Sequence, residues 1–288
     1  MKRAATLILA LAAGLAAPAL AEPPARIATA GGALTEIVYA LGHEERLVGV
    51  DATSIYPEAA RALPQIGYFR QLSAEGLLAL TPDLLLADPG SGPPAALSLL
   101  RDAGLEVVMA PQTATLDQIA AKIGFVGEAL EDQAGGEALA ADFGARLGAV
   151  RDAVARIPDR PRVLFIMTIS EGAPLVGGAG TAADAMIGEA GGINAAADIP
   201  GYKPMSREAL IAAAPDHVVV SSAHAARDGG IEGLAARPDI AATPAGAAGR
   251  IGVIDTMLLL GMGPRAPEGV AALARMIHSP EAISAAGL

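Results

Sequence analysis

A tyrosine and an arginine two residues apart form the motif with the clearest chemical potential in this chain, Gly67-Tyr68-Phe69-Arg70. In an extended loop, residues i and i+2 point the same way, so Arg70 would lie beside the phenol of Tyr68. A neighbouring cation favours the phenolate, which is an anionic ligand for ferric iron, and tyrosine is one of the axial ligands of haem. Tyr68 is therefore a candidate iron ligand, and the alternative is a half-buried packing tyrosine.

The tyrosine motif stands just before a segment that the chain uses twice. Residues 72–86 (LSAEGLLALTPDLLL) and 205–219 (MSREALIAAAPDHVV) align with a constant offset of 133. Gly201-Tyr202 precedes the second copy as Gly67-Tyr68 precedes the first, and Lys203 follows Tyr202. This spacing is far wider than the period of about 20–50 residues of a solenoid. It predicts two similar lobes with a binding cleft between them.

Each copy of the repeat begins with Ser-x-Glu, which is typical of the start of a helix. Ser73 and Ser206 are placed to cap the first turn, where a hydroxyl accepts a bond from an early helix N–H. Glu75 and Glu208 follow at the second helical position, where the helix dipole favours a negative charge. Two interpretations stay open: ordinary helix starts, or two exposed carboxylates that dock on two basic sites of a partner.

Other residues bear on ligand binding and catalysis. The loop before Arg265 (Gly261-Met262-Gly263-Pro264) could present this arginine to a ligand carboxylate, as Lys203 could from the second lobe; a surface arginine is the alternative. The four histidines are dispersed, and only His224, in a predicted loop, stays a weak candidate ligand. No nucleophile elbow, phosphate loop or dinucleotide fingerprint is present, so we expect no enzyme.

The ends and the composition limit the class of protein. Residues 1–21 read as a cleaved signal peptide, with Lys2 and Arg3 before an apolar run and Ala19-Leu20-Ala21 at the cleavage site. The rest has no stretch long enough to cross a membrane, so we expect a soluble periplasmic protein. The chain has no cysteine and a net charge of −11. Acidity excludes nucleic acid and anionic membrane as natural partners and suits a basic partner surface.

Short β-like runs alternate with helical patterns, which predicts an α/β fold with mainly parallel sheets. Two consecutive helices are expected over Leu116–Leu130 and Ala134–Ile157, with a break at Gly135 and Gly136. The second would be about 36 Å long, enough to join two lobes as a strut. We therefore expect an N-terminal lobe (22–131), a linker helix (132–158) and a C-terminal lobe (159–288), the lobes being Rossmann-like with a ligand cleft between them.

Nearly all of the chain after residue 21 resembles the periplasmic haem-binding proteins of bacterial haem-uptake ABC transporters. These belong to the substrate-binding proteins with a helical backbone, which also include vitamin B12 and siderophore binders. The resemblance is carried by four segments: Pro64–Gly76, Thr181–Asp184, Gly201–Pro204 and Gly263–Arg265. It implies two α/β lobes on one long helix, with a small closure on binding.

The resemblance also implies residue roles. Tyr68 would be the axial ligand of haem iron, Arg70 would hydrogen-bond its oxygen, and Glu75 and Glu208 would dock on arginines of the permease dimer. Residues 167–170 offer no histidine for a second haem. The expected function is a monomeric, non-enzymatic carrier of haem b that delivers its cargo to an inner-membrane importer. The alternatives are the same fold with a ferric siderophore or cobalamin, and an exported metal-dependent enzyme.

Overall fold

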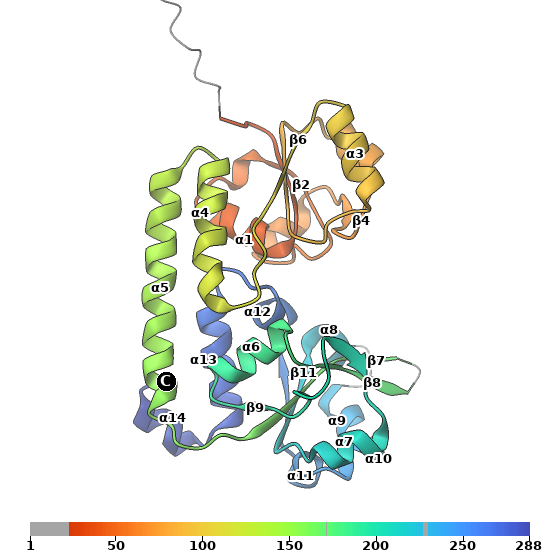
Figure 1. Ribbon diagram of the computed structural model, residues 1–288, viewed down its shortest axis with the longest axis vertical. Coiled ribbons are helices and arrows are strands. Elements are labelled where there is room, and N and C mark those ends of the chain that lie inside the picture. The colour runs from red at the N-terminus through yellow and green to blue at the C-terminus, as the bar shows by residue number, and fades with distance from the viewer. Residues whose placement is uncertain (1–22, 171, 227–229) are drawn as a thin grey trace, which may run out of the picture.

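The computed structural model describes residues 23–170, 172–226 and 230–288. The predicted signal peptide lies outside the described residues. Two α/β lobes follow one another along the longest axis of the molecule, and the long helix α5 (Gln133–Ala155) runs beside both of them (Figure 1). The predicted fold class is confirmed. Each lobe is built around a sheet of its own, and the long helix α5 lies between the two sheets in the order of the chain.

The N-terminal lobe contains a four-stranded parallel sheet in the order β2-β1-β5-β6. Its strands are β1 (Ile27–Ala30), β2 (Leu47–Val50), β5 (Leu84–Ala87) and β6 (Glu106–Met109). One face packs on α1 (Gly32–Ala40) and α4 (Ile119–Ala129), the other on α2 (Ala74–Ala79) and α3 (Pro94–Asp102). The central strands β1 and β5 are buried along their whole length because both faces of the sheet are covered.

The C-terminal lobe contains a six-stranded mixed sheet in the order β10-β8-β7-β11-β12, with β9 also paired to β7. The strands are β7 (Arg162–Ser170), β8 (Ala173–Gly177), β9 (Ile193–Asn194), β10 (Tyr202–Pro204), β11 (His217–Ser221) and β12 (Ile251–Ile254). β8 and β10 are antiparallel to their neighbours, and the other pairs are parallel. The expectation of mainly parallel sheets therefore holds for the first lobe more fully than for the second.

Several helices cover the second sheet. On one face lie α6 (Ala182–Glu189), α12 (Thr256–Leu260) and α13 (Ala266–Ile277). On the other lie α7 (Arg207–Ala213), α9 (Gly230–Ala235), α10 (Pro238–Ala241) and α11 (Pro244–Ala247). A short helix, α14 (Pro280–Ala286), follows α13 and has Ser279 as its N-cap. Among the described residues, no helix is both long and apolar enough to cross a membrane.

The two predicted middle helices are present, but the break between them lies elsewhere. α4 ends at Ala129, Glu131 has a positive φ of 58°, and Asp132 caps α5 by accepting the N–H of Gly135 at 3.0 Å. Gly136 lies inside α5 and touches α4: a Cβ built on Gly127 would come within 2.7 Å of the Gly136 Cα. The glycines therefore allow two helices to approach closely, rather than ending one of them.

A continuous apolar core joins the lobes to α5. It extends from Leu34 and Ile123 in the first lobe, through Phe143 and Leu147 of α5, to Phe165 in the second. Two further clusters fill the opposite faces of the two sheets. The lobes thus share buried surface along the side of α5, and the cleft between them can open only on the other side.

Candidate functional site

The predicted loop around Tyr68 is a small hairpin, in which β3 (Gly67–Tyr68) pairs antiparallel with β4 (Gln71–Leu72). Phe69 and Arg70 form the turn between the strands. Gly67 has a φ of 98°, and a Cβ there would lie 2.8 Å from the carbonyl oxygen of Gln71. The hairpin therefore requires glycine at this position for both its backbone conformation and its close approach.

The turn gives Arg70 a neighbour that the sequence analysis did not anticipate. Its guanidinium carbon lies 5.1 Å from the ring centroid of Phe69, a cation–π arrangement. Tyr68 packs edge-on against the same ring at 4.7 Å and keeps 41 % of its surface exposed. Within the described residues, no hydrogen bond joins Arg70 to the Tyr68 hydroxyl. The assumption of an extended loop was wrong, because the turn directs the two side chains differently.

A fully buried carboxylate, Asp51, holds the hairpin against the sheet. It follows β2 and accepts the backbone N–H of Phe69 at 3.2 Å and that of Gly31 at 3.1 Å. It also accepts bonds from the hydroxyls of Thr53 and Ser54 at 2.9–3.0 Å. Because the donors come from separate loops, Asp51 fixes their relative positions at the carboxyl edge of the sheet. Sequence reasoning missed this residue.

The second tyrosine motif is built differently. Tyr202 and Lys203 lie on β10, which pairs with β8 at the edge of the six-stranded sheet. Both side chains are exposed, Tyr202 to 36 %. Partial burial raises the pKa of Tyr202, although hydrogen bonds to the Thr181 side chain and the Ala183 backbone oppose this rise. Burial is thus the larger of the two effects on the phenol of Tyr202.

A pocket of about 470 Å³ lies between the lobes, lined by residues from both. The N-terminal lobe contributes residues that include Phe69, Arg70, Asp88 and Lys122; the C-terminal lobe contributes residues that include Met167, Thr181, Tyr202 and Met262. In the chain, Tyr68 directly precedes the lining residue Phe69, and Lys203 directly follows the lining residue Tyr202. The structure thus brings the two tyrosine motifs to one interlobe cleft whose walls are partly apolar and partly cationic.

The cleft also contains a buried ion pair that sequence reasoning missed. Lys122 of α4 is 3 % exposed, and its Nζ donates to Oδ1 of Asp88 at 3.0 Å. Burial raises the pKa of Asp88, and the ammonium of Lys122 opposes this effect. One sequence signal was available: Lys122 interrupts the apolar face of the helix predicted over 116–130.

Arg265 does not line this cleft. Its guanidinium makes a two-point ion pair with the buried carboxylate of Glu36 on α1, at 2.6 and 2.9 Å, and lies 3.4 Å from the ring centroid of Tyr56. Burial raises the pKa of Glu36 against the lowering effect of Arg265. The pair joins the start of α13 to the N-terminal lobe, so its partner here is a protein carboxylate.

His224 is not in a loop. It lies in the short helix α8 (Ser222–Ala225), 1 % exposed, with Nδ1 3.4 Å from the hydroxyl of Thr168. Residues 167–170 therefore do have a histidine neighbour in space, although none is near in sequence. Met167, the residue before Thr168, lines the interlobe cleft.

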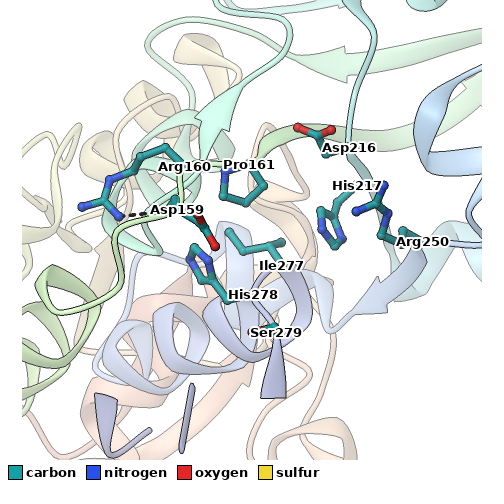
Figure 2. Close-up of a pocket in the computed structure, with 9 residues that line it drawn as sticks. All are labelled: Asp159, Arg160, Pro161, Asp216, His217, Arg250, Ile277, His278 and Ser279. Carbon is teal, nitrogen blue, oxygen red and sulfur yellow. Dashed lines mark hydrogen bonds between the residues drawn. The ribbon is translucent and has the colours of Figure 1, made fainter. Parts of the chain in front are cut away.

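Two other histidines line a second pocket, of about 540 Å³, at the amino-terminal end of the C-terminal sheet (Figure 2). Burial and the nearby Arg250 lower the pKa of His217. His278 donates through Nε2 to the carbonyl oxygen of Ala190 at 2.9 Å. Across the described residues, no group of three or more His, Cys, Asp or Glu could hold a metal ion.

Both repeat helices begin as predicted. The Ser73 hydroxyl accepts the N–H of Gly76 at 3.1 Å, and the Ser206 hydroxyl accepts the N–H of Ala209 at 3.2 Å. Glu75 and Glu208 are exposed on the first turns of α2 and α7. Hydrogen bonds from its own backbone and from the Ser206 hydroxyl lower the pKa of Glu208, which therefore stays ionised at neutral pH.

Comparisons with known proteins place this architecture. The periplasmic heme-binding protein RhuT from Roseiflexus sp. RS-1 is 42 % identical, with a TM-score of 0.84 over 92 % of this chain and 100 % of RhuT. The periplasmic heme-binding protein BhuT, solved with two hemes, is 45 % identical, with a TM-score of 0.84 over 90 % and 98 %. A vitamin B12-binding protein of Vibrio cholerae is 32 % identical over 72 % of this chain and 74 % of its own length.

A family model also matches most of the chain. The periplasmic binding protein model covers residues 27–257, which include both sheets and the long helix α5. The family and these neighbours are binding proteins, not enzymes. The chain belongs to the periplasmic binding protein family.

Proposed function

We propose that this protein is a periplasmic carrier of haem b, which binds ferric haem in the interlobe cleft with Tyr68 as the axial ligand. The observation that carries the proposal is the exposed side chain of Tyr68, on a hairpin that is held by the buried Asp51 and whose turn residues Phe69 and Arg70 line the cleft. Tyr202 lines the same cleft from the other side. Solved proteins of the same fold at 42 % and 45 % identity are heme-binding proteins.

The cleft has the chemistry that a porphyrin needs. Phe69, Met167 and Met262 offer apolar and polarisable surface to a flat ring. Arg70 and the nearby Lys203 offer cations for carboxylates. In the proposed complex Arg70 leaves the ring of Phe69 and donates to the Tyr68 oxygen, favouring the phenolate. Arg265 can reach a ligand carboxylate only if it leaves Glu36, so we give it no part in the first binding event.

An optical titration with ferric hemin tests the ligand assignment. The parent should give a saturable high-spin spectrum with a phenolate-to-iron band. Tyr68→Phe should lose the band and bind on the order of 100-fold more weakly, because even the outer partners of metal ligands contribute about 10–100-fold to affinity. Tyr202→Phe is the matched variant and should keep the band. A Tyr68→Phe spectrum identical to that of the parent would refute the assignment.

Cobalamin is the second candidate, favoured by the vitamin B12-binding relatives at 29–32 % identity. The same titration, repeated with cyanocobalamin and with a ferric siderophore, separates the candidates. Saturable binding of cobalamin with no specific hemin spectrum would mean that the protein is a binding protein whose ligand is cobalamin and not haem. Haem is preferred because the phenol of Tyr68 is a good ligand for ferric iron.

We further propose that the protein acts as a monomer and delivers its cargo to the permease dimer of an inner-membrane ABC importer, with Glu75 and Glu208 as docking carboxylates. Export through residues 1–21 would bring it to the periplasm. In reconstituted transporter, Glu75→Ala with Glu208→Ala should abolish the stimulation of ATP hydrolysis, whereas Glu137→Ala on α5 should not. Unchanged stimulation in the double variant would end the docking proposal.

A further inference from the structure

Lys122 occupies a position where its helix otherwise buries apolar side chains. Its neighbours on α4, Ile119, Ile123 and Val126, are all buried in the main core. An ammonium taken out of water is costly unless it is paired and hydrogen-bonded. A leucine or methionine would fill the same space without that cost. The lysine therefore calls for a role beyond packing.

The partners of Lys122 leave donors to spare. An ammonium carries three N–H donors. Among the described residues, the one hydrogen bond of Nζ is that to Asp88 Oδ1 at 3.0 Å. Both residues line the cleft, although Lys122 is 3 % exposed, so the ion pair lies at the inner wall of the ligand space. At least one donor can thus reach an acceptor placed in the cleft.

Asp88 is a constrained partner. Its other oxygen lies against Gly31, where a Cβ would come within 2.3 Å of Oδ2, so only glycine leaves room for this carboxylate. Burial and the nearby Asp51 both disfavour its charge, and Lys122 is what offsets them. The Asp88 carboxylate therefore holds the lysine in place. Burial and the charge of Asp51 both weaken its hold, so a carboxylate of a ligand could compete with Asp88 for the ammonium.

We infer that the Lys122 ammonium is the subsite for a carboxylate of the bound ligand at the back of the cleft, and that Asp88 is its placeholder when no ligand is bound. The inference rests on the proposed function, because haem is a flat apolar ring with carboxylates on one edge. The exposed Arg70 and Lys203 lie nearer the rim, so Lys122 would fix the inner end of the ligand. It would discriminate between porphyrins that carry carboxylates and those that do not.

The test compares ferric hemin with its dimethyl ester, which has the same ring and iron but no carboxylates. Lys122→Met should weaken hemin binding by about 10–100-fold, the range expected for a charge-assisted hydrogen bond, and leave ester binding unchanged. Arg101→Met on α3 removes an exposed cation away from the cleft and should change neither. Equal losses for hemin and ester, or no loss for either, would overturn the inference.

A second variant covers the case in which Lys122→Met does not fold. Asp88→Asn removes the competing charge and should raise the preference for hemin over the ester several-fold, whereas an unchanged or lower preference would contradict the inference. The parent titration judges the proposed function separately: if the parent binds neither porphyrin, the haem proposal fails. If the parent binds both equally, the haem proposal stands and the carboxylate subsite fails.

Discussion

In the N-terminal lobe, Gly67-Tyr68 opens a hairpin of two short strands that belongs to neither large sheet. In the C-terminal lobe, Gly201-Tyr202 leads into β10 at the edge of the six-stranded sheet. The downstream helices start identically, with a serine cap and an exposed glutamate. Similar sequences thus place one tyrosine on an independent projection and the other on a sheet edge, so a repeated motif does not imply a repeated role.

The difference comes from what each motif is attached to. The first hairpin is held by the carbonyl of Gly67, which accepts from Ala52 at 2.8 Å, and by Asp51, which accepts from Phe69. The second motif is held by a strand ladder and by the carbonyl of Gly201, which accepts from Gly178 at 3.0 Å. A buried side chain therefore does in one lobe what backbone pairing does in the other.

The largest expected effect is at Asp51. Asp51→Ala leaves several buried donors without an acceptor, each costing about 1–3 kcal/mol, so the free energy of unfolding should fall by roughly 3 kcal/mol or more. Asp184→Ala is the matched variant, since within the described part of the chain Asp184 accepts from two donors near the second motif, Gly180 and Asn194. Denaturant unfolding measures both, and a smaller loss for Asp51→Ala would break the comparison.

A smaller difference in the free energy of unfolding is expected between alanine variants of Gly67 and Gly201, the glycines that precede the two tyrosines. Gly67→Ala must distort the hairpin, because its Cβ would meet the Gln71 carbonyl at 2.8 Å, and should cost about 2–3 kcal/mol. Gly201 has a φ of 71° but open space around it, so Gly201→Ala should cost about 1 kcal/mol. Urea denaturation of the two variants compares them, and hemin binding should weaken more for Gly67→Ala. Equal costs would mean that the hairpin adapts.

The smallest effect concerns the ionisation of Tyr202. Its pKa is raised above the ordinary 10.0 by partial burial, so its contribution to stability is fully present below pH about 10 and is lost as the pH rises through the folded-state value. An ultraviolet titration should lose a high-pH phenol in Tyr202→Phe. The pKa of Tyr39 is raised as well, so Tyr39→Phe should also lose a high-pH phenol, and the two variants together separate the two contributions. If Tyr202→Phe leaves the high-pH end of the titration unchanged, the pKa of Tyr202 is not raised by its burial.

Local pattern was enough to predict most of the fold. Alternating β-like and helical runs predicted the α/β class, and the central strands β1, β5 and β11 are buried along nearly all of their length. The serine caps and the long helix α5 also follow from nearest-neighbour chemistry and helical periodicity. The short strands β3 and β10 were not predicted, because two or three residues carry no period.

The contacts between distant residues in and around the cleft needed the tertiary structure. Asp88 is 34 residues from Lys122, and Arg265 is 229 residues from Glu36, so neither ion pair has a signature at the spacing of one element. Thr168 and His224 meet across 56 residues for the same reason. The sequence by itself determined two lobes, a long helix and a repeated tyrosine motif, because these depend on local periodicity and capping. Only the folded chain decided how each tyrosine motif is held and which charges are already paired, because these depend on contacts between distant segments.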